Sequence, residues 1–359
     1  MTAPPRSPEA PGRAVEAAPV GERRAHPAWM VVVFGVVLLV LTALGVLVGS
    51  RPAPVADVVA ALLGDETAAE HDLVWELRLP RTVLAVLVGA ALGLAGAVMQ
   101  ALTRNPLADP GLLGVNAGAA AAVAVALALS WASSVAMTVW WAMAGAALAS
   151  VVVHLLGSRG LDGGSPTKLV LAGTAISAAL VALTNGLVLS VPRAFDQFRF
   201  WAVGSLEGRG TDVLLDVLPF IAVGIGGALL LGRGLNALVL GDELARTLGA
   251  NLTSIRLAGL LVITLLCGAA TAAAGPLAFV GLTVPHVARR WARSDERWVL
   301  WLSGLLGASL VVAADLVGRV VVRPGELEVG IVAALIGGPF FVAMVRRAER
   351  GARRRGAAA

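Results

Sequence analysis

A stretch of 47 residues, 110–156, contains no Asp, Glu, Lys or Arg. As one continuous α-helix it would be roughly 70 Å long, which is about twice the thickness of the bilayer hydrocarbon core. The stretch is therefore expected to cross a membrane, turn and cross it again. The polar sequence Ser130–Ser134 is the predicted turn. A segment of this kind constrains the chain to be a membrane protein.

The composition of the whole chain agrees with this interpretation. Of its 359 residues, 58% are apolar and 14% are charged, whereas a soluble domain has about 25% charged residues. These values exclude a soluble enzyme, a nucleic-acid-binding domain and a disordered protein. The net charge of +5 is attributed to basic loops on the cytoplasmic side. The single cysteine, Cys267, excludes an intrachain disulfide and a cysteine-cluster metal site, and no cofactor or metal is expected.

Other charge-free stretches supply the remaining membrane spans. The stretch 257–285 is too long for one crossing and too short for two, and Gly275–Pro276 should divide it into a long helix and a short one that ends near Arg289. The prediction is an all-α polytopic protein of about ten helices. The other six expected spans are 29–49, 82–103, 169–191, 214–232, 299–318 and 329–345.

The distribution of basic residues predicts the orientation. An even number of spans places both termini on one side. If that side is cytoplasmic, the inner segments hold 20 basic residues and the outer segments 8, which follows the positive-inside rule. The expected organisation is a disordered cytoplasmic tail over 1–28, a transmembrane domain over 29–346 with a long inner loop at about 233–256, and a basic cytoplasmic tail over 347–359.

Uncharged polar residues occur at membrane depth. Interhelical hydrogen bonds explain each one singly, but together they suit a wet, neutral pathway better than a proton relay, which needs carboxylates. Only Asp315 comes close to an intramembrane carboxylate, near the outer third of its helix. The polar residues are Gln100, Asn105, Asn116, Thr174, Ser177, Thr184 and Asn185.

Two regions outside the spans carry candidate binding functions. The inner segment 241–249 has acidic residues at its start and a glycine at its end, so it predicts a short helix that is either a solvated surface element or a docking site for a cytoplasmic partner. On the outer side, Arg78, Arg81 and Arg319 lie where the positive-inside rule disfavours arginine. Snorkelling of the side chains to the interface or docking of carboxylates from an external protein would each explain them.

Four separated motifs, 77–82, 96–114, 241–249 and 275–286, closely resemble the FecCD family. These proteins are the permease subunits of ATP-driven importers for iron–siderophores, haem and vitamin B12. The resemblance covers about residues 30–346 and implies the ten-helix permease fold of the vitamin B12 importer. It also implies that the protein lies in a bacterial cytoplasmic membrane and has three partners. These are a second permease subunit (the same chain or a sister permease), a dimer of ATPases on the cytoplasmic side and a substrate-binding protein on the outside.

The resemblance assigns roles position by position. Arg78, Arg81 and Arg319 match outer arginines that pair with glutamates of the binding protein. Asn105 and Leu107 match residues of the cytoplasmic gate, Ser165 or Thr167 is a second gate element, and Asn116 is placed on the translocation path. The coupling residues that match the ATPase-docking loop are Gly241, Asp242, Glu243, Ala245, Arg246, Leu248 and Gly249. The acidic outer segment around 57–72 and the long N-terminal tail are not explained by the motifs.

The chain is expected to have no catalytic activity of its own. It contains no Gly-x-x-x-x-Gly-Lys-Ser/Thr motif, and its single lysine, Lys168, lies outside any glycine-rich loop. The energy for transport would then come from the partner ATPase, through alternating access. Three rivals are an ion-coupled secondary transporter, a membrane scaffold and an intramembrane protease. A ferric siderophore is the preferred substrate by family resemblance, with vitamin B12 or haem as the alternatives.

Overall fold

The computed structural model describes residues 27–132, 134–157 and 166–356. Eight of its helices are long and apolar enough to cross a membrane. The shorter helices α4 (Val115–Ala128) and α11 (Val280–Ala288) bring the number close to the predicted ten, and the all-α polytopic fold is confirmed. The long helices are α1 (Pro27–Leu47), α3 (Leu79–Thr103), α5 (Val135–Gly157), α6 (Pro166–Ser190), α8 (Thr211–Val239), α10 (Leu252–Ala274), α12 (Glu296–Val321) and α13 (Val329–Gly356).

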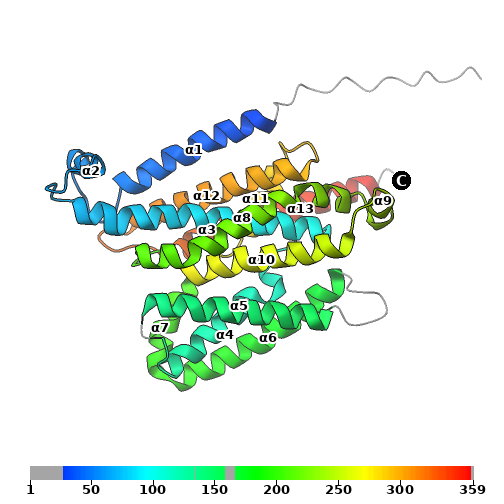
Figure 1. Ribbon diagram of the computed structural model, residues 1–359, viewed down its shortest axis with the longest axis horizontal. Coiled ribbons are helices and arrows are strands. Elements are labelled where there is room, and N and C mark those ends of the chain that lie inside the picture. Colours follow the sequence, from blue (N-terminus) through cyan, green and yellow to red (C-terminus); the bar gives the residue numbers. More distant parts are fainter. Residues whose placement is uncertain (1–26, 133, 158–165, 357–359) are drawn as a thin grey trace, which may run out of the picture.

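Helix α3 is the centre of the bundle. Its apolar span, which includes the preceding π-helical turn Leu73–Arg78, is 78% buried, and α8, α10, α11 and α12 pack around it (Figure 1). Close approach of these backbones depends on glycine. A Cβ atom on Gly89 would lie 2.3 Å from the carbonyl oxygen of Gly307, and one on Gly96 would lie 1.9 Å from that of Gly281. These glycines therefore allow the close packing of the helices.

Helices α4, α5 and α6 form a second layer below this core (Figure 1). The turn expected at Ser130–Ser134 lies between α4 and α5. Helix α6 is the most exposed part of this layer, with only 11% of its apolar span buried. An apolar helix surface of this extent is expected to face either lipid or a partner chain.

The break predicted at Gly275–Pro276 is confirmed. Helix α10 ends at Ala274, and Gly275 takes a left-handed φ of 75°. Pro276 cannot continue the hydrogen-bonded helix, and α11 begins only at Val280. The break begins inside the protein, where Gly275 is buried and Ser205 donates its backbone N–H to the carbonyl of Ala274 at 2.8 Å. Irregular backbone at this depth is tolerated because the protein itself provides its hydrogen bonds.

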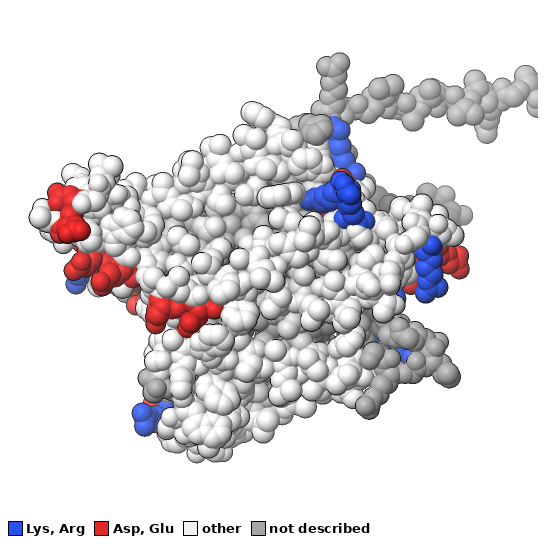
Figure 2. Space-filling model, viewed as in Figure 1, with Lys and Arg blue, Asp and Glu red and all other residues white. Residues whose placement is uncertain are grey.

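Three short helices lie outside the spans: α2 (Val55–Leu62), α7 (Pro192–Val203) and α9 (Asp242–Thr247). Helices α2 and α9 occupy opposite ends of the bundle (Figure 1), which are called the α2 end and the α9 end below. Helix α1 begins and α13 ends at the α9 end, as an even number of spans requires. Acidic side chains gather over the α2 end, including the exposed Asp65, Glu66, Asp72 and Glu76 (Figure 2).

The chain termini relate differently to the expected domains. The tail expected over 1–28 lies outside the described residues, except that α1 already includes residues 27 and 28. Residues 347–356, expected as a separate tail, continue α13 as helix to Gly356.

Candidate functional site

The three arginines predicted on the outer side, Arg78, Arg81 and Arg319, come together at the α2 end. All three line one cavity of about 320 Å³. Its wall contains five arginines and two glutamates, so the cavity is basic. The full lining is Gly49, Ser50, Arg51, Leu73, Leu77, Arg78, Arg81, Glu207, Gly208, Arg209, Arg319 and Glu326.

Arg78 joins the end of α1 to the start of α3. Its guanidinium donates to the carbonyl oxygens of Val46 at 3.2 Å, Leu47 at 2.9 Å and Arg51 at 2.8 Å. These carbonyls come at and just after the C-terminus of α1, where helix carbonyls lack intrahelical partners. The residue is only 5% exposed, so its first role in this structure is to hold α1 against the core.

Arg81 and Arg319 share a buried carboxylate. Arg81 donates from Nε and Nη2 to Oδ1 of Asp315, at 3.1 and 2.7 Å, and Arg319 pairs with the other oxygen. Arg81 also forms an ion pair with Glu326 at 2.6 Å, and Arg319 donates to the carbonyl of Gly45 at 2.6 Å. The side chains of Arg319 and Asp315 are 2% and 3% exposed, so neither charge would be stable there without the other.

These bonds change what the predicted docking role requires. Neither Arg78 nor Arg319 presents a free guanidinium in this conformation. A carboxylate from an external protein would have to compete with Glu326 for Arg81, or use Arg51 and Arg209, which sequence reasoning did not select. The i,i+4 spacing of Asp315 and Arg319 was the one signal in the sequence for this cluster, whereas nothing local predicts their pairing with Arg81.

The residues predicted at the gate fall in two places. Asn105 and Leu107 lie in the exposed loop after α3 at the α9 end, where Oδ1 of Asn105 accepts the backbone N–H of Leu107 at 3.0 Å. Asn116 lies instead between α4 and α10, and its Oδ1 accepts from Thr271 at 2.8 Å. Ser165 lies outside the described residues, and the side chain of Thr167 is not among those described.

The predicted coupling helix is α9, and its two ends need glycine. Gly241 has a φ of 109° and Gly249 a φ of 79°, a region that other residues adopt only at a cost. Ala245 is buried against Leu238 and Leu252. The exposed surface is formed by Glu243, Leu244, Arg246, Thr247 and Leu248.

Asp242 faces the protein rather than solvent. Its carboxylate pairs with Arg104, which follows α3, and accepts from Arg256 of α10 at 2.6 Å. Arg104 also donates to the carbonyl of Leu238 at the end of α8, at 2.8 Å. Burial tends to raise the pKa of Asp242, but the hydrogen bonds from the two arginines lower it below its usual value. Asp242 therefore ties α9 to two spans, α3 and α10, and Arg104 lies next to Asn105 of the predicted gate.

Among the described residues no group of three or more His, Cys, Asp or Glu side chains is placed to hold a metal ion. The arrangement therefore consists of a basic cavity at one end, a projecting short helix at the other and a membrane bundle between them. Comparison with known proteins shows to which family a chain with this arrangement belongs.

The sequence profile of the FecCD transport family matches residues 37–347. The chain belongs to the FecCD transport family. The ferric enterobactin transport system permease protein FepD of Escherichia coli is 47% identical over 314 residues, covering 88% of this chain and 94% of that protein. A siderophore transport system permease protein of Bacillus subtilis, YfiZ, is 38% identical over 91% of this chain and 99% of its own length.

The solved structure of an inward-facing metal-chelate type ABC transporter has the same fold. It superposes with a TM-score of 0.78 at 24% identity and covers 89% of this chain and 99% of the other. The FecCD resemblance and the permease fold expected from the four motifs are thus confirmed. As a FecCD permease with eight long apolar helices, the protein is a multi-pass membrane protein.

Proposed function

We propose that this FecCD permease carries a ferric siderophore across the cytoplasmic membrane as the membrane subunit of an ATP-driven importer. The observation that carries the proposal is the near full-length similarity, at 47% identity, to a ferric enterobactin permease. The permease acts by alternating access and catalyses no reaction itself. Its energy comes from a partner ATPase, since the sequence has no phosphate-binding glycine loop.

The contact with the ATPase is α9. Its exposed Leu244 and Leu248 are 49% and 64% exposed, which is unusual for leucine on a solvated loop and is suited to a partner's cleft. Asp242 and Ala245, by contrast, lie on the side of α9 that contacts the rest of the permease, and they hold the helix in place. Movement of α9 is transmitted to α3 and α10 through Arg104 and Arg256.

The contact with the binding protein is the basic cavity at the α2 end. Five arginines around one opening favour the carboxylates of a docking protein. Because Arg81 is already paired with Glu326, docking would exchange one carboxylate for another. Such an exchange leaves a buried arginine paired at every stage and so avoids a large desolvation cost.

The path lies between two copies of the permease, along the exposed face of α6. Thr174, Asn185 and Ser190 are exposed on this helix although it is long enough to span the membrane. The hydroxyls of Thr174 and Ser190 donate to carbonyls of their own helix at 2.9 and 2.7 Å, whereas the amide of Asn185 would be unfavourable in lipid and suits a water-filled path between subunits. With the α9 end in the cytoplasm, the α2 end, where acidic side chains gather (Figure 2), faces outward.

Reconstitution tests this proposal. The permease is placed in vesicles with its companion ATPase, a binding protein loaded with a radiolabelled ferric siderophore is added outside, and uptake is measured with and without ATP. We expect uptake to require both ATP and the binding protein. Excess cobalamin or haem should not inhibit this uptake. Uptake by the permease alone on a proton or sodium gradient would identify a secondary transporter and contradict the proposal.

A further inference from the structure

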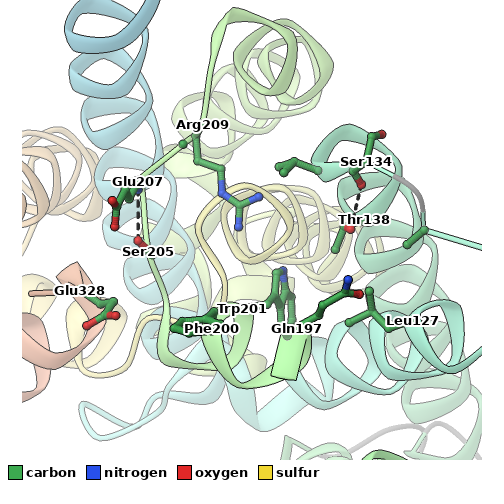
Figure 3. A pocket seen from close by; sticks show the side chains of 13 residues that line it. Leu127, Ser134, Thr138, Gln197, Phe200, Trp201, Ser205, Glu207, Arg209 and Glu328 are labelled. Carbon is green, nitrogen blue, oxygen red and sulfur yellow. Dashed lines mark hydrogen bonds between the residues drawn. The ribbon is translucent and has the colours of Figure 1, made fainter. Parts of the chain in front are cut away.

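A second cavity, of about 550 Å³, opens at the α2 end between the layer of α4 and α5 and the segment 197–209 (Figure 3). It shares Glu207, Gly208 and Arg209 with the basic cavity. Its volume lies in the range of small-molecule sites, and its wall combines aliphatic and aromatic surface with a few polar groups. The lining includes Leu127, Ser134, Thr138, Gln197, Phe200 and Trp201.

Two hydrogen-bond donors in this cavity have no partner. The Nε1–H of Trp201 and the Nε–H of Arg209 are both buried and donate to no acceptor among the described residues. Trp201 itself is only 5% exposed. Figure 3 shows the indole nitrogen and the guanidinium directed toward the middle of the cavity. A buried donor left unpaired is unfavourable, so these two groups favour a ligand that brings acceptor atoms into the cavity.

In contrast to Arg81 and Arg319, Arg209 is also not ion-paired with a described residue, although Asp212 is nearby. Burial lowers the pKa of Arg209, and the nearby charge of Asp212 opposes this effect. The Arg209 guanidinium is therefore available to an anion that enters the cavity.

The rest of the wall is asymmetric. Gln197 and Thr138 lie on the side of the donors, whereas the carboxylates of Glu207 and Glu328 lie together at the opposite edge (Figure 3). Ser205 accepts the backbone N–H of Glu207 at 3.1 Å, which fixes that edge. A negatively charged ligand would be attracted to the Arg209 side and repelled from the Glu207 edge, so that it enters in one orientation.

We propose that this cavity is an outer binding site for an anionic, oxygen-rich iron chelate with aromatic rings, such as a tris-catecholate. The anionic oxygens accept from Arg209, Trp201 and Gln197, and the rings pack on Phe200 and the Trp201 indole. The site holds the chelate on the permease between its release from the binding protein and its passage inward. This inference rests on the proposed import of ferric siderophores and adds the chemical class of the substrate.

The test measures binding to the full-length permease in lipid nanodiscs. The probe is a trianionic ferric complex of a hexadentate tris-catecholate, titrated up to about 1 mM by calorimetry, because weaker binding would be of little use to a carrier. The comparison probe is a cationic ferric trihydroxamate. We expect saturable binding of the anionic complex only, weakened about tenfold by Arg209→Gln and severalfold by Trp201→Phe, since each removes one donor.

Arg193→Gln is the matched control, because Arg193 is exposed on α7 and does not line the cavity. Equal binding to the Arg209→Gln variant, equal binding of the cationic probe or no saturable binding by the wild type would each overturn the site. Weaker attachment of the binding protein to Arg209→Gln, with chelate binding unchanged, would leave Arg209 with its docking role alone and overturn its role in the chelate site. Siderophore uptake that persists in any of these cases leaves the proposed function intact, so the two failures are distinguishable.

Discussion

The carboxylate of Asp242 in α9 lies 2.6 Å from the guanidinium of Arg256 in α10, and its other oxygen pairs with Arg104 after α3. The short helix that is proposed to contact the ATPase is thus attached to two spans by one side chain. The attachment is partly exposed, with Asp242 at 33% and Arg104 at 39%, so its free energy is modest. It serves to transmit movement more than to stabilise the fold.

Replacing Asp242 by Asn should therefore uncouple the importer without unfolding it. Loss of about 1 kcal/mol at a partly exposed pair is expected to reduce uptake roughly fivefold while ATP hydrolysis by the partner continues. The measurement is transported chelate per ATP hydrolysed in vesicles. Asp242→Glu should restore part of the ratio, and Glu66→Gln, exposed at the opposite α2 end, should not change it. A ratio unaffected in Asp242→Asn would exclude this transmission.

Arg81 carries both a structural and a proposed docking role, and the two are separable. Arg81→Gln removes the cation between Asp315 and Glu326, which should cost about 3 kcal/mol because a buried pair loses one partner. The thermal melt of the purified variant checks this cost. Affinity for the binding protein is then measured well below the melting temperature. If the melting temperature falls while the affinity stays at the wild-type value, the docking role is removed and the structural role remains.

The contact between Gly96 and Gly281 should tolerate no side chain. Gly96→Ala places a methyl group 1.9 Å from a backbone oxygen in α11, and overpacking of this kind costs about 1–3 kcal/mol. We expect a lower melting temperature and reduced yield of folded protein in detergent. Gly226→Ala in α8 is the control, since its added Cβ meets nothing within 4 Å and alanine is the better helix former. Equal stability of both variants would contradict the close packing seen here.

The Arg81–Glu326 pair predicts a defined response to acid. Burial raises the pKa of Glu326, but the hydrogen bond from Ser50 and the charges of Arg81 and Arg319 outweigh it, and the net pKa lies below 4.5. A carboxyl with a lowered pKa stabilises the fold fully above its unfolded value and loses this contribution as the pH falls through its folded value. Melting temperature should therefore be insensitive to Glu326 between about pH 6 and 8 and should decline below about pH 4.5. The Glu326→Gln variant should show a shallower decline in acid, and an identical acid profile would show that this carboxyl contributes nothing.

The sequence was sufficient for the spans because hydropathy is a local property. The turn near Ser130 and the break at Gly275 were predictable for the same reason, since turn polarity, glycine and proline act on neighbouring residues. The charged clusters were not predictable. Arg81 and Asp315 are separated by 234 positions, and only packing of α3 against α12 brings them together. The outer arginines therefore looked available for a partner, although all three are bonded within the chain. Trp201 and Arg209 were missed because an unpaired donor is recognisable only once its surroundings are known.

Helix α1 illustrates a further consequence of these buried arginines. Its apolar span is only 11% buried, so by area it looks like an accessory helix that a shortened chain could do without. Its last carbonyls, however, are the acceptors for Arg78 and Arg319. Deleting α1 would leave the buried guanidinium groups of Arg78 and Arg319 without several of their hydrogen-bond acceptors. A minimal version of this permease must keep its first crossing for the sake of the charges at its tip.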